Sequence, residues 1–125
     1  MTHLQRIAPV ILVEDVISTA EYYRDALGFE FDRFWGDPPQ MVLADRGDVR
    51  IGLMQAPVAH IPPAPSGFAD AFIYVDDVDG LADEVRGRGA RIVAEPAEST
   101  VFDGRTMSII DCNRRVLTFV MIRSS

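Results

Sequence analysis

An internal repeat constrains the fold of this 125-residue chain more than any other feature of its sequence. Residues 11–31 read ILVEDVISTAEYYRDALGFEF, and residues 73–93 read IYVDDVDGLADEVRGRGARIV. Aligning Asp15 with Asp77 brings apolar positions into register on both sides of the aspartate, with a period of about 62 residues that is too long for a solenoid. The chain therefore contains two copies of one supersecondary unit.

Each copy reads as a strand, a helix and a second strand. An alternating apolar run ends at Asp15 in the first copy and at Asp77 in the second, and each aspartate is suited to cap the helix that follows. Its carboxylate accepts hydrogen bonds from free N–H groups of the first turn and favours the positive end of the helix dipole. Gly28 and Gly89 are expected to end the two helices, because glycine readily adopts the left-handed conformation that closes a helix.

Hydrophobic periodicity and turn residues extend this pattern along the chain. The first unit is predicted to contain a helix at 16–27 and strands at 6–13, 29–35, 40–44 and 49–55. The second is predicted to contain a helix at 78–88, strands at 68–75, 90–94, 105–110 and 116–121, and a loop at 96–102. The order β-α-β-β-β thus occurs twice.

Residues 56–67 separate the two units. This segment contains four prolines, which remove backbone donors and fix φ, so we expect an extended linker without regular structure. The modules are then 6–55 and 68–122, within a single domain, 1–125, of the α+β class. One helix covers one face of each four-stranded sheet, and the other face must also be buried. The two modules are therefore expected to enclose a shared cleft, which is the default binding site.

Composition narrows the environment and the partners. A single cysteine, Cys112, rules out an internal disulfide framework and fits a reducing compartment, so a cytoplasmic protein is expected. Residues 1–10 lack the pattern of a signal peptide, and no apolar run approaches the roughly eighteen residues of a membrane span. A formal net charge of −7 and a pI of ≈ 4.6 disfavour nucleic acids and membranes as partners and favour cationic ligands.

Short motifs are spread over nearly the whole chain: PVIL at 9–12, EDV at 14–16, EYYRD at 21–25, LGF at 27–29, DGR at 103–105 and DCN at 111–113. Together they resemble the vicinal oxygen chelate (VOC) superfamily, and within it the glyoxalase and bleomycin resistance protein branch. The resemblance implies two βαβββ modules around a shared cleft, a fold that hosts many chemistries. In members that use a metal, it implies one ligand near the start of the first strand and one in the fourth strand of each module.

The positions that correspond to those four ligands carry few donor atoms. They are Ala8 and Gly52 in the first module, and Asp70 and Thr118 in the second. Alanine and glycine side chains cannot ligate a metal, and one carboxylate with one hydroxyl falls short of the three or so strong ligands that hold a divalent ion. We therefore expect a protein without a metal or another cofactor.

Other signals of catalysis are weak. His3 lies near the N-terminus, His60 in the linker and Cys112 in a hairpin turn, so all three are expected to be surface residues without a catalytic role. No Ser-His-Asp or Cys-His combination is evident. The glycines of segment 86–89 end a helix, whereas phosphate-binding glycines open one. These observations favour a binding protein over an enzyme.

Strand alternation predicts which side chains line the cleft. Residues of the same parity as the ligand positions face it, and those of the opposite parity pack under the helices. Aromatic residues at the end of the second strand and in the 96–102 loop are expected at its mouth. The predicted ligand-binding residues are Phe34, Trp35, Arg50, Met54, Asp70, Phe72, Tyr74, Phe102 and Thr118. An apolar, aromatic pocket with one acid suits a flat, partly cationic organic molecule.

Three functions remain open at this stage. The first is a metal-free protein that sequesters a cationic aromatic compound in the cleft, as bleomycin resistance proteins sequester their drug, which implies a role in antibiotic resistance. The second is a metal-dependent enzyme, such as a glyoxalase or dioxygenase. The third is a cofactorless enzyme of the same superfamily. The ligand positions favour the first over the second, but the first and third stay open because Asp70 can bind a cation or act as a base.

The sequence also predicts a homodimer. Open sheet edges invite pairing with a second chain. Pro9, near the first strand, resembles the arm proline of bleomycin resistance relatives that exchange an N-terminal strand between subunits. A small organic ligand and a second copy of the chain are therefore the expected partners.

Overall fold

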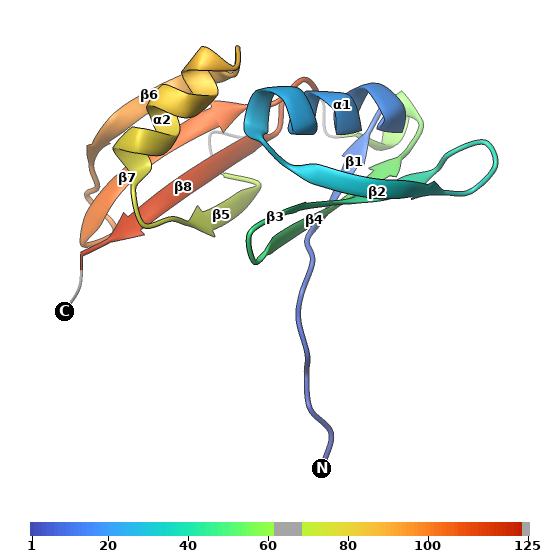
Figure 1. Cartoon of the computed structure of the whole chain (residues 1–125), viewed down its shortest axis with the longest axis horizontal. Helices are drawn as coiled ribbons and strands as arrows, with labels where there is room; N and C mark the ends of the chain where they lie inside the picture. The colour runs from blue at the N-terminus through green and yellow to red at the C-terminus, as the bar shows by residue number, and fades with distance from the viewer. Residues whose placement is uncertain (62–68, 124–125) are drawn as a thin grey trace.

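The computed structural model describes residues 1–61 and 69–123. Two helices lie on one side of the molecule with two β-sheets beneath them, and the N-terminal segment runs away from the body (Figure 1). A strand, a helix and three further strands follow one another in each half of the chain. The predicted α+β fold of two βαβββ modules is confirmed.

The elements are bounded as follows. The first module contains β1 (Val10–Val13), α1 (Val16–Leu27), β2 (Glu30–Trp35), β3 (Met41–Arg46) and β4 (Val49–Gln55). The second contains β5 (Ala71–Tyr74), α2 (Val78–Gly87), β6 (Arg91–Glu98), β7 (Gly104–Ile110) and β8 (Val116–Ile122). A short 3-10 turn, η1 (Val58–His60), follows β4.

Local sequence explains where the helices begin and end. The Asp15 carboxylate accepts from two N–H groups in the first turn of α1, at 3.0 and 3.1 Å. The Asp77 carboxylate accepts from the Gly80 N–H at 2.9 Å in α2. Gly28 closes α1 with a φ of 74°, and Gly89 follows α2 with a φ of 96°. Both values lie in the left-handed region that favours glycine, so the predicted stops are confirmed.

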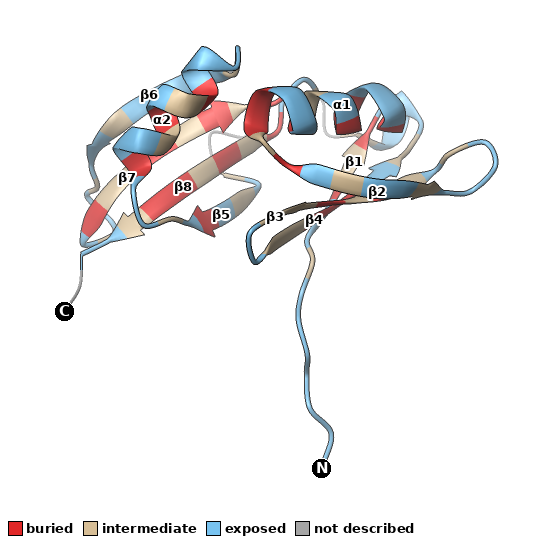
Figure 2. Cartoon of the chain, in the orientation of Figure 1, coloured by how far each residue is buried: buried red, intermediate tan, exposed pale blue. Residues whose placement is uncertain are grey.

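The two sheets have the same topology. Their strand orders are β1-β4-β3-β2 and β5-β8-β7-β6, and the first strand of each module runs parallel to the last while the other pairs are antiparallel. Each helix packs on one face of its own sheet, where the buried positions gather (Figure 2). The largest fully buried side chains include Tyr23, Leu27 and Leu53 in the first module and Met107 and Leu117 in the second.

Polar contacts join the modules at two places. The Tyr23 hydroxyl on α1 donates to Asp111 Oδ2 in the β7–β8 turn at 2.7 Å, and both residues are buried. At the end of β3, Arg46 donates to both carboxylate oxygens of Glu84 on α2, at 3.0 and 2.7 Å. Arg46 also donates to the Leu27 carbonyl at 2.8 Å, which ties the same guanidinium to the end of α1.

The first strand is shorter than predicted. The segment 6–13 was expected to be a strand throughout, but β1 begins only at Val10. Pro9 has no N–H to donate, and its carbonyl accepts from the Gly52 N–H at 2.8 Å, so it is the last point of attachment before the sheet. The preceding residues extend away from both sheets (Figure 1).

Two segments expected to be irregular contain regular structure. Part of the predicted 96–102 loop belongs to β6, which continues to Glu98 and includes Pro96. The missing Pro96 N–H costs no ladder bond, since β6 is an edge strand and its register with β7 shifts between Ala94 and Ala97. In the predicted linker, Val58–His60 forms a 3-10 turn, and 62–67 lies outside the described residues. The strand predicted at 68–75 is shorter, since β5 spans Ala71–Tyr74, and Phe68 lies outside the described residues. The remaining predicted elements agree with the structure to within one or two residues at each end.

Candidate functional site

Each sheet leaves the face opposite its helix open (Figures 1 and 2). Large apolar side chains on strands remain accessible there, which is unusual for positions inside a sheet. On the first sheet these are Val10, Trp35 and Met54, and on the second they are Phe72 and Tyr74, at 56% and 61% exposure. These side chains lie on the faces that point away from the helices.

The open face of the first sheet is lined by apolar groups around one ion pair. Met54 on β4 lies opposite Met41 on β3. Arg50 donates to both carboxylate oxygens of Asp45, at 2.6 and 3.1 Å, and this hydrogen-bonded pairing raises the pKa of Arg50. The positive charge predicted at Arg50 is therefore largely balanced within the same sheet.

Trp35 is the last residue of β2, and its indole ring contacts the side chain of Arg33. The Arg33 guanidinium lies 4.7 Å from the centre of the Trp35 ring system, a cation–π distance. The side chain is 37% exposed, so part of the indole stays free to contact a ligand.

The open face of the second sheet carries three aromatic rings. Phe72 and Phe102 meet edge to face, with ring centres 5.4 Å apart and planes at 82°. Tyr74 meets Phe102 in the same way, at 6.5 Å and 90°. Phe102 comes from the β6–β7 connection and contacts the two β5 residues, Phe72 and Tyr74. These rings form the aromatic cluster.

Phe34 does not belong to either open face. Its partner across the sheet is Val42, which is fully buried in the core. The Phe34 ring lies 5.3 Å from that of Phe31, and both rings pack against the core. Sequence reasoning placed Phe34 and Trp35 together at the cleft mouth, but adjacent strand residues point to opposite faces.

Asp70 and Thr118, the two possible metal donors, already have partners in the chain. Asp70 Oδ2 accepts from the Val116 N–H at 2.7 Å, and Oδ1 lies 3.6 Å from the Arg115 guanidinium. The Thr118 hydroxyl shares a 2.8 Å hydrogen bond with that of Ser108. Within residues 1–61 and 69–123, no three His, Cys, Asp or Glu side chains gather as a metal would require. The family's implied metal therefore does not fit these residues.

A cavity of about 730 Å³ lies where the two modules meet, and we term it the inter-module groove. The β3–β4 turn of the first module and the end of α1 form one wall, and β5, the β5–α2 connection and α2 form the other. Its volume is typical of a small-molecule site. Of the predicted ligand-binding residues, Tyr74 alone lines it within the described parts of the chain.

Part of the groove is lined by strand residues whose parity predicted that they pack under the helices. These are Ile73, Val75 and Phe119, and turn and helix residues complete the lining. The repeat could not reveal this arrangement, because it describes each module and not the contact between them.

Residues 3–112 match the model of the "Glyoxalase/Bleomycin resistance protein/Dioxygenase superfamily". The chain belongs to this superfamily. The members share the paired βαβββ architecture described above, so the resemblance read from the six motifs is confirmed.

Solved structures of this superfamily superpose over nearly the full chain. A bleomycin-binding protein from bleomycin-producing Streptomyces verticillus, complexed with copper(II)-bleomycin, is 23% identical, with a TM-score of 0.76 and coverage of 99% of this chain and 100% of that one. A bleomycin resistance determinant encoded on the transposon Tn5 is 20% identical, with a TM-score of 0.78 and coverage of 97% and 100%. An antibiotic binding protein from Streptomyces sp. CB03234 is 16% identical, with a TM-score of 0.71 and coverage of 98% and 100%. At these identities the likeness establishes the fold.

No match was found among curated proteins. In the described parts of the chain, neither helix has the length and apolar character needed to cross a membrane.

Proposed function

We propose that this protein binds and sequesters a small cationic aromatic compound on the open faces of its sheets, without a metal. The observation that carries the proposal is the aromatic cluster of Phe72, Tyr74 and Phe102, which is exposed on the second sheet with no helix over it. Exposed rings that already meet edge to face offer π-faces for stacking and for contact with a cation.

The net negative charge of the whole chain supports a cationic ligand more strongly than any single acidic residue does. The chain has a formal net charge of −7, which raises the local concentration of cations around it. Asp70 was predicted to be the acid of the site, but it interacts with the buried Arg115, which offsets its charge. Stacking on the aromatic cluster is therefore proposed as the main contribution, with electrostatic attraction as the second.

The same faces support the predicted homodimer. A single chain leaves Val10, Met54, Phe72 and Tyr74 open to water, and a second copy that covers them would turn two open faces into enclosed sites. We expect light scattering at micromolar concentration to give about twice the chain mass of 13.9 kDa. A mass that stays at one chain over the whole concentration range would contradict the dimer.

Binding can be measured with bleomycin, which is named in the descriptions of several structural relatives. We expect saturable binding by calorimetry, and weakening by about fivefold to tenfold in Phe72→Ala, because one stacking contact contributes roughly 1 kcal/mol. Trp35→Ala should weaken binding by a smaller factor, since Arg33 already occupies part of the indole. Quenching of Trp35 emission offers a second readout.

Ile17→Ala is a matched control for these variants. Ile17 is also a large exposed apolar residue, but it lies on α1, away from the open faces. Its replacement should leave bleomycin affinity unchanged. Equal loss in the control and in Phe72→Ala, or no binding at tens of micromolar by a folded wild-type chain, would refute sequestration of this ligand class.

A further inference from the structure

We propose that the inter-module groove is a second binding site, which takes a compact organic cation with an apolar body, such as a quaternary or primary amine attached to an aromatic ring. This site shares only Tyr74 with the aromatic cluster among the residues that the structure describes, and the inference does not rest on the proposed function. It is carried by three features that coincide in one place: a cavity of suitable size, an apolar floor and carboxylates without a partner at the rim.

The floor of the groove is apolar. Phe29 and Val49 contribute to it from the first module, and Ile73, Val75 and Phe119 contribute from the second. A ligand enclosed there gains by removing apolar surface from water, by roughly 25 cal/mol per Å². A ligand that is charged throughout would lose hydration on this floor without compensation, so the body of the ligand must be apolar.

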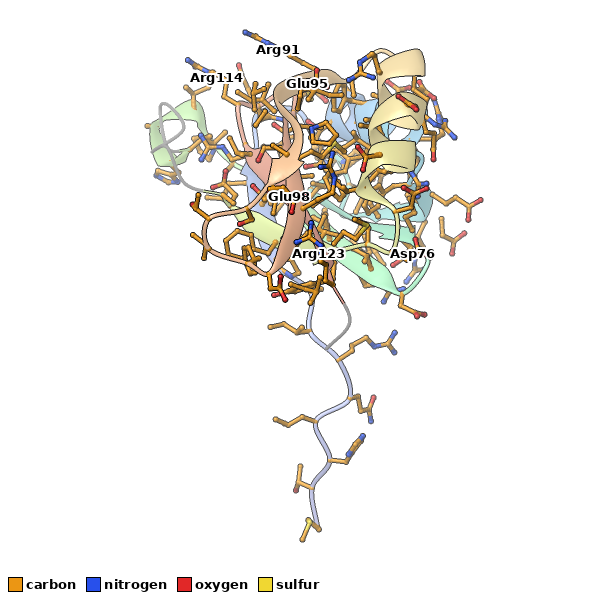
Figure 3. All side chains as sticks on the ribbon, turned by 90° about the vertical axis from the view of Figure 1, so that its left-hand side faces the viewer. Asp76, Arg91, Glu95, Glu98, Arg114 and Arg123 are labelled. Atoms are coloured by element: carbon orange, nitrogen blue, oxygen red, sulfur yellow. The ribbon has the colours of Figure 1, made fainter. Side chains whose placement is uncertain are left out.

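The rim supplies negative charge from both modules. Asp48 lies in the β3–β4 turn and Asp76 in the β5–α2 connection, and both line the groove. Asp76 is labelled in Figure 3. Neither carboxylate has a hydrogen bond or ion pair within the described parts of the chain. Both are therefore available to a cation that enters the groove.

The other acidic residues of the groove, Asp77 and Glu84, already form hydrogen bonds within the chain. Asp77 accepts from the Gly80 N–H as the cap of α2. Glu84 is held by Arg46 and Arg88, and these hydrogen bonds lower the pKa of its carboxyl, with the one from Arg46 contributing most. The groove is lined by Arg46 and by the carboxylates of Asp48, Asp76, Asp77 and Glu84, so its net charge is negative, which disfavours anions.

A metal ion fits this groove less well than an organic cation. A divalent ion requires several oxygens converging at short distance, and the two free carboxylates come from separate loops and are exposed. An organic cation needs no such convergence, because its charge can be shared by carboxylates several ångströms away while its body lies on the apolar floor.

Benzyltrimethylammonium is a suitable probe, with benzyl alcohol as its neutral counterpart. In titrations of the full chain followed by two-dimensional ¹⁵N NMR, we expect saturable shifts at the amides of Gly47, Asp76 and Gly80, with a Kd on the order of 1 mM. Benzyl alcohol should bind at least threefold more weakly at the same amides. Equal binding of the neutral probe would overturn the cationic assignment.

Two variants and a matched control locate the charge. Asp48→Asn and Asp76→Asn should each weaken the probe by about threefold, a modest factor because exposed carboxylates are screened. Asp37→Asn removes the same charge from the turn that precedes β3, at the opposite end of that strand from Asp48, and should leave the affinity unchanged. Equal weakening in all three variants would show general electrostatic attraction only and would overturn the site.

Phe72→Ala separates this inference from the proposed function. It removes a ring of the aromatic cluster but does not line the groove, so probe binding at Gly47 and Gly80 should persist. If the probe shifts only amides of β5 and β8 on the open face, or if the groove amides change with protein dilution and not with probe, the groove is not this site. The latter outcome would identify it as a contact with a second copy.

Discussion

Replacing Asp111 by alanine is expected to destabilise the protein by about 3 to 5 kcal/mol, the cost of breaking a buried polar network at the junction of the modules. Asp111 is 5% exposed and accepts three hydrogen bonds. Its Oδ2 accepts from the Tyr23 hydroxyl at 2.7 Å, and its Oδ1 accepts from the Asn113 and Arg115 N–H groups at 2.7 and 2.9 Å. Alanine would leave two buried donors, the Tyr23 hydroxyl and the Arg115 N–H, and the part-buried Asn113 N–H without an acceptor. Urea denaturation of both proteins at pH 7 provides the measurement.

Asp111→Asn is the informative control, because an amide keeps the size of the side chain and one carbonyl acceptor. Its oxygen can accept both backbone N–H groups, and its NH₂ can donate to the Tyr23 oxygen. Burial raises the pKa of the Asp111 carboxyl, partly offset by its hydrogen bonds, so folding favours the neutral form. The stability associated with that form is fully present below pH 3.8 and is lost as pH rises through the folded pKa.

Asparagine is neutral at every pH and does not incur this loss. Asp111→Asn should therefore lose much less stability than Asp111→Ala at pH 7, and its disadvantage against the wild type should shrink further as pH rises through the folded pKa. If asparagine and alanine destabilise equally, the carboxylate itself, and not a satisfied network, is what the junction requires.

The secondary structure within each module was readable from the sequence because local chemistry determines it. Asp15 and Gly28 bound α1 as predicted, since the cap and the left-handed stop are properties of those residues themselves. The end of β6 was misjudged because Pro96 normally interrupts a strand, and only the position of β6 at a sheet edge makes the proline tolerable. That position depends on sheet order, which is not a local property.

The two faces of each sheet were also predictable, but the junction between the modules was not. Period-two alternation places Met54 and Phe72 on open faces, as the structure shows. No local pattern links Tyr23 to Asp111, which are separated by 88 residues and belong to two different sequence motifs. The same limitation hid the inter-module groove, since its residues look like core until the two modules are placed beside each other.

Replacing Gly104 by alanine should lower the free energy of unfolding by about 3 kcal/mol or more, because two backbones approach each other closely there. This close approach accounts for the glycine of the DGR motif at 103–105. Gly104 is buried at the start of β7 and pairs with Ile122 on β8. A Cβ at this position would overlap the Met121 carbonyl oxygen and crowd the Met121 carbonyl carbon at 2.9 Å, so two strands would have to separate. Because these are backbone atoms, no rotamer change can relieve the contact.

Gly87→Ala is the matched control for this prediction. Gly87 is the last residue of α2, and a Cβ there meets nothing within 4 Å. Alanine loses less conformational entropy than glycine in a helix, so this variant should be neutral or more stable by up to about 1 kcal/mol. The urea midpoints and melting temperatures of Gly104→Ala and Gly87→Ala should therefore shift in opposite directions. At the least, the two melting temperatures should differ by several degrees. A Gly104→Ala protein as stable as the wild type would mean that β7 and β8 lie farther apart than the structure places them.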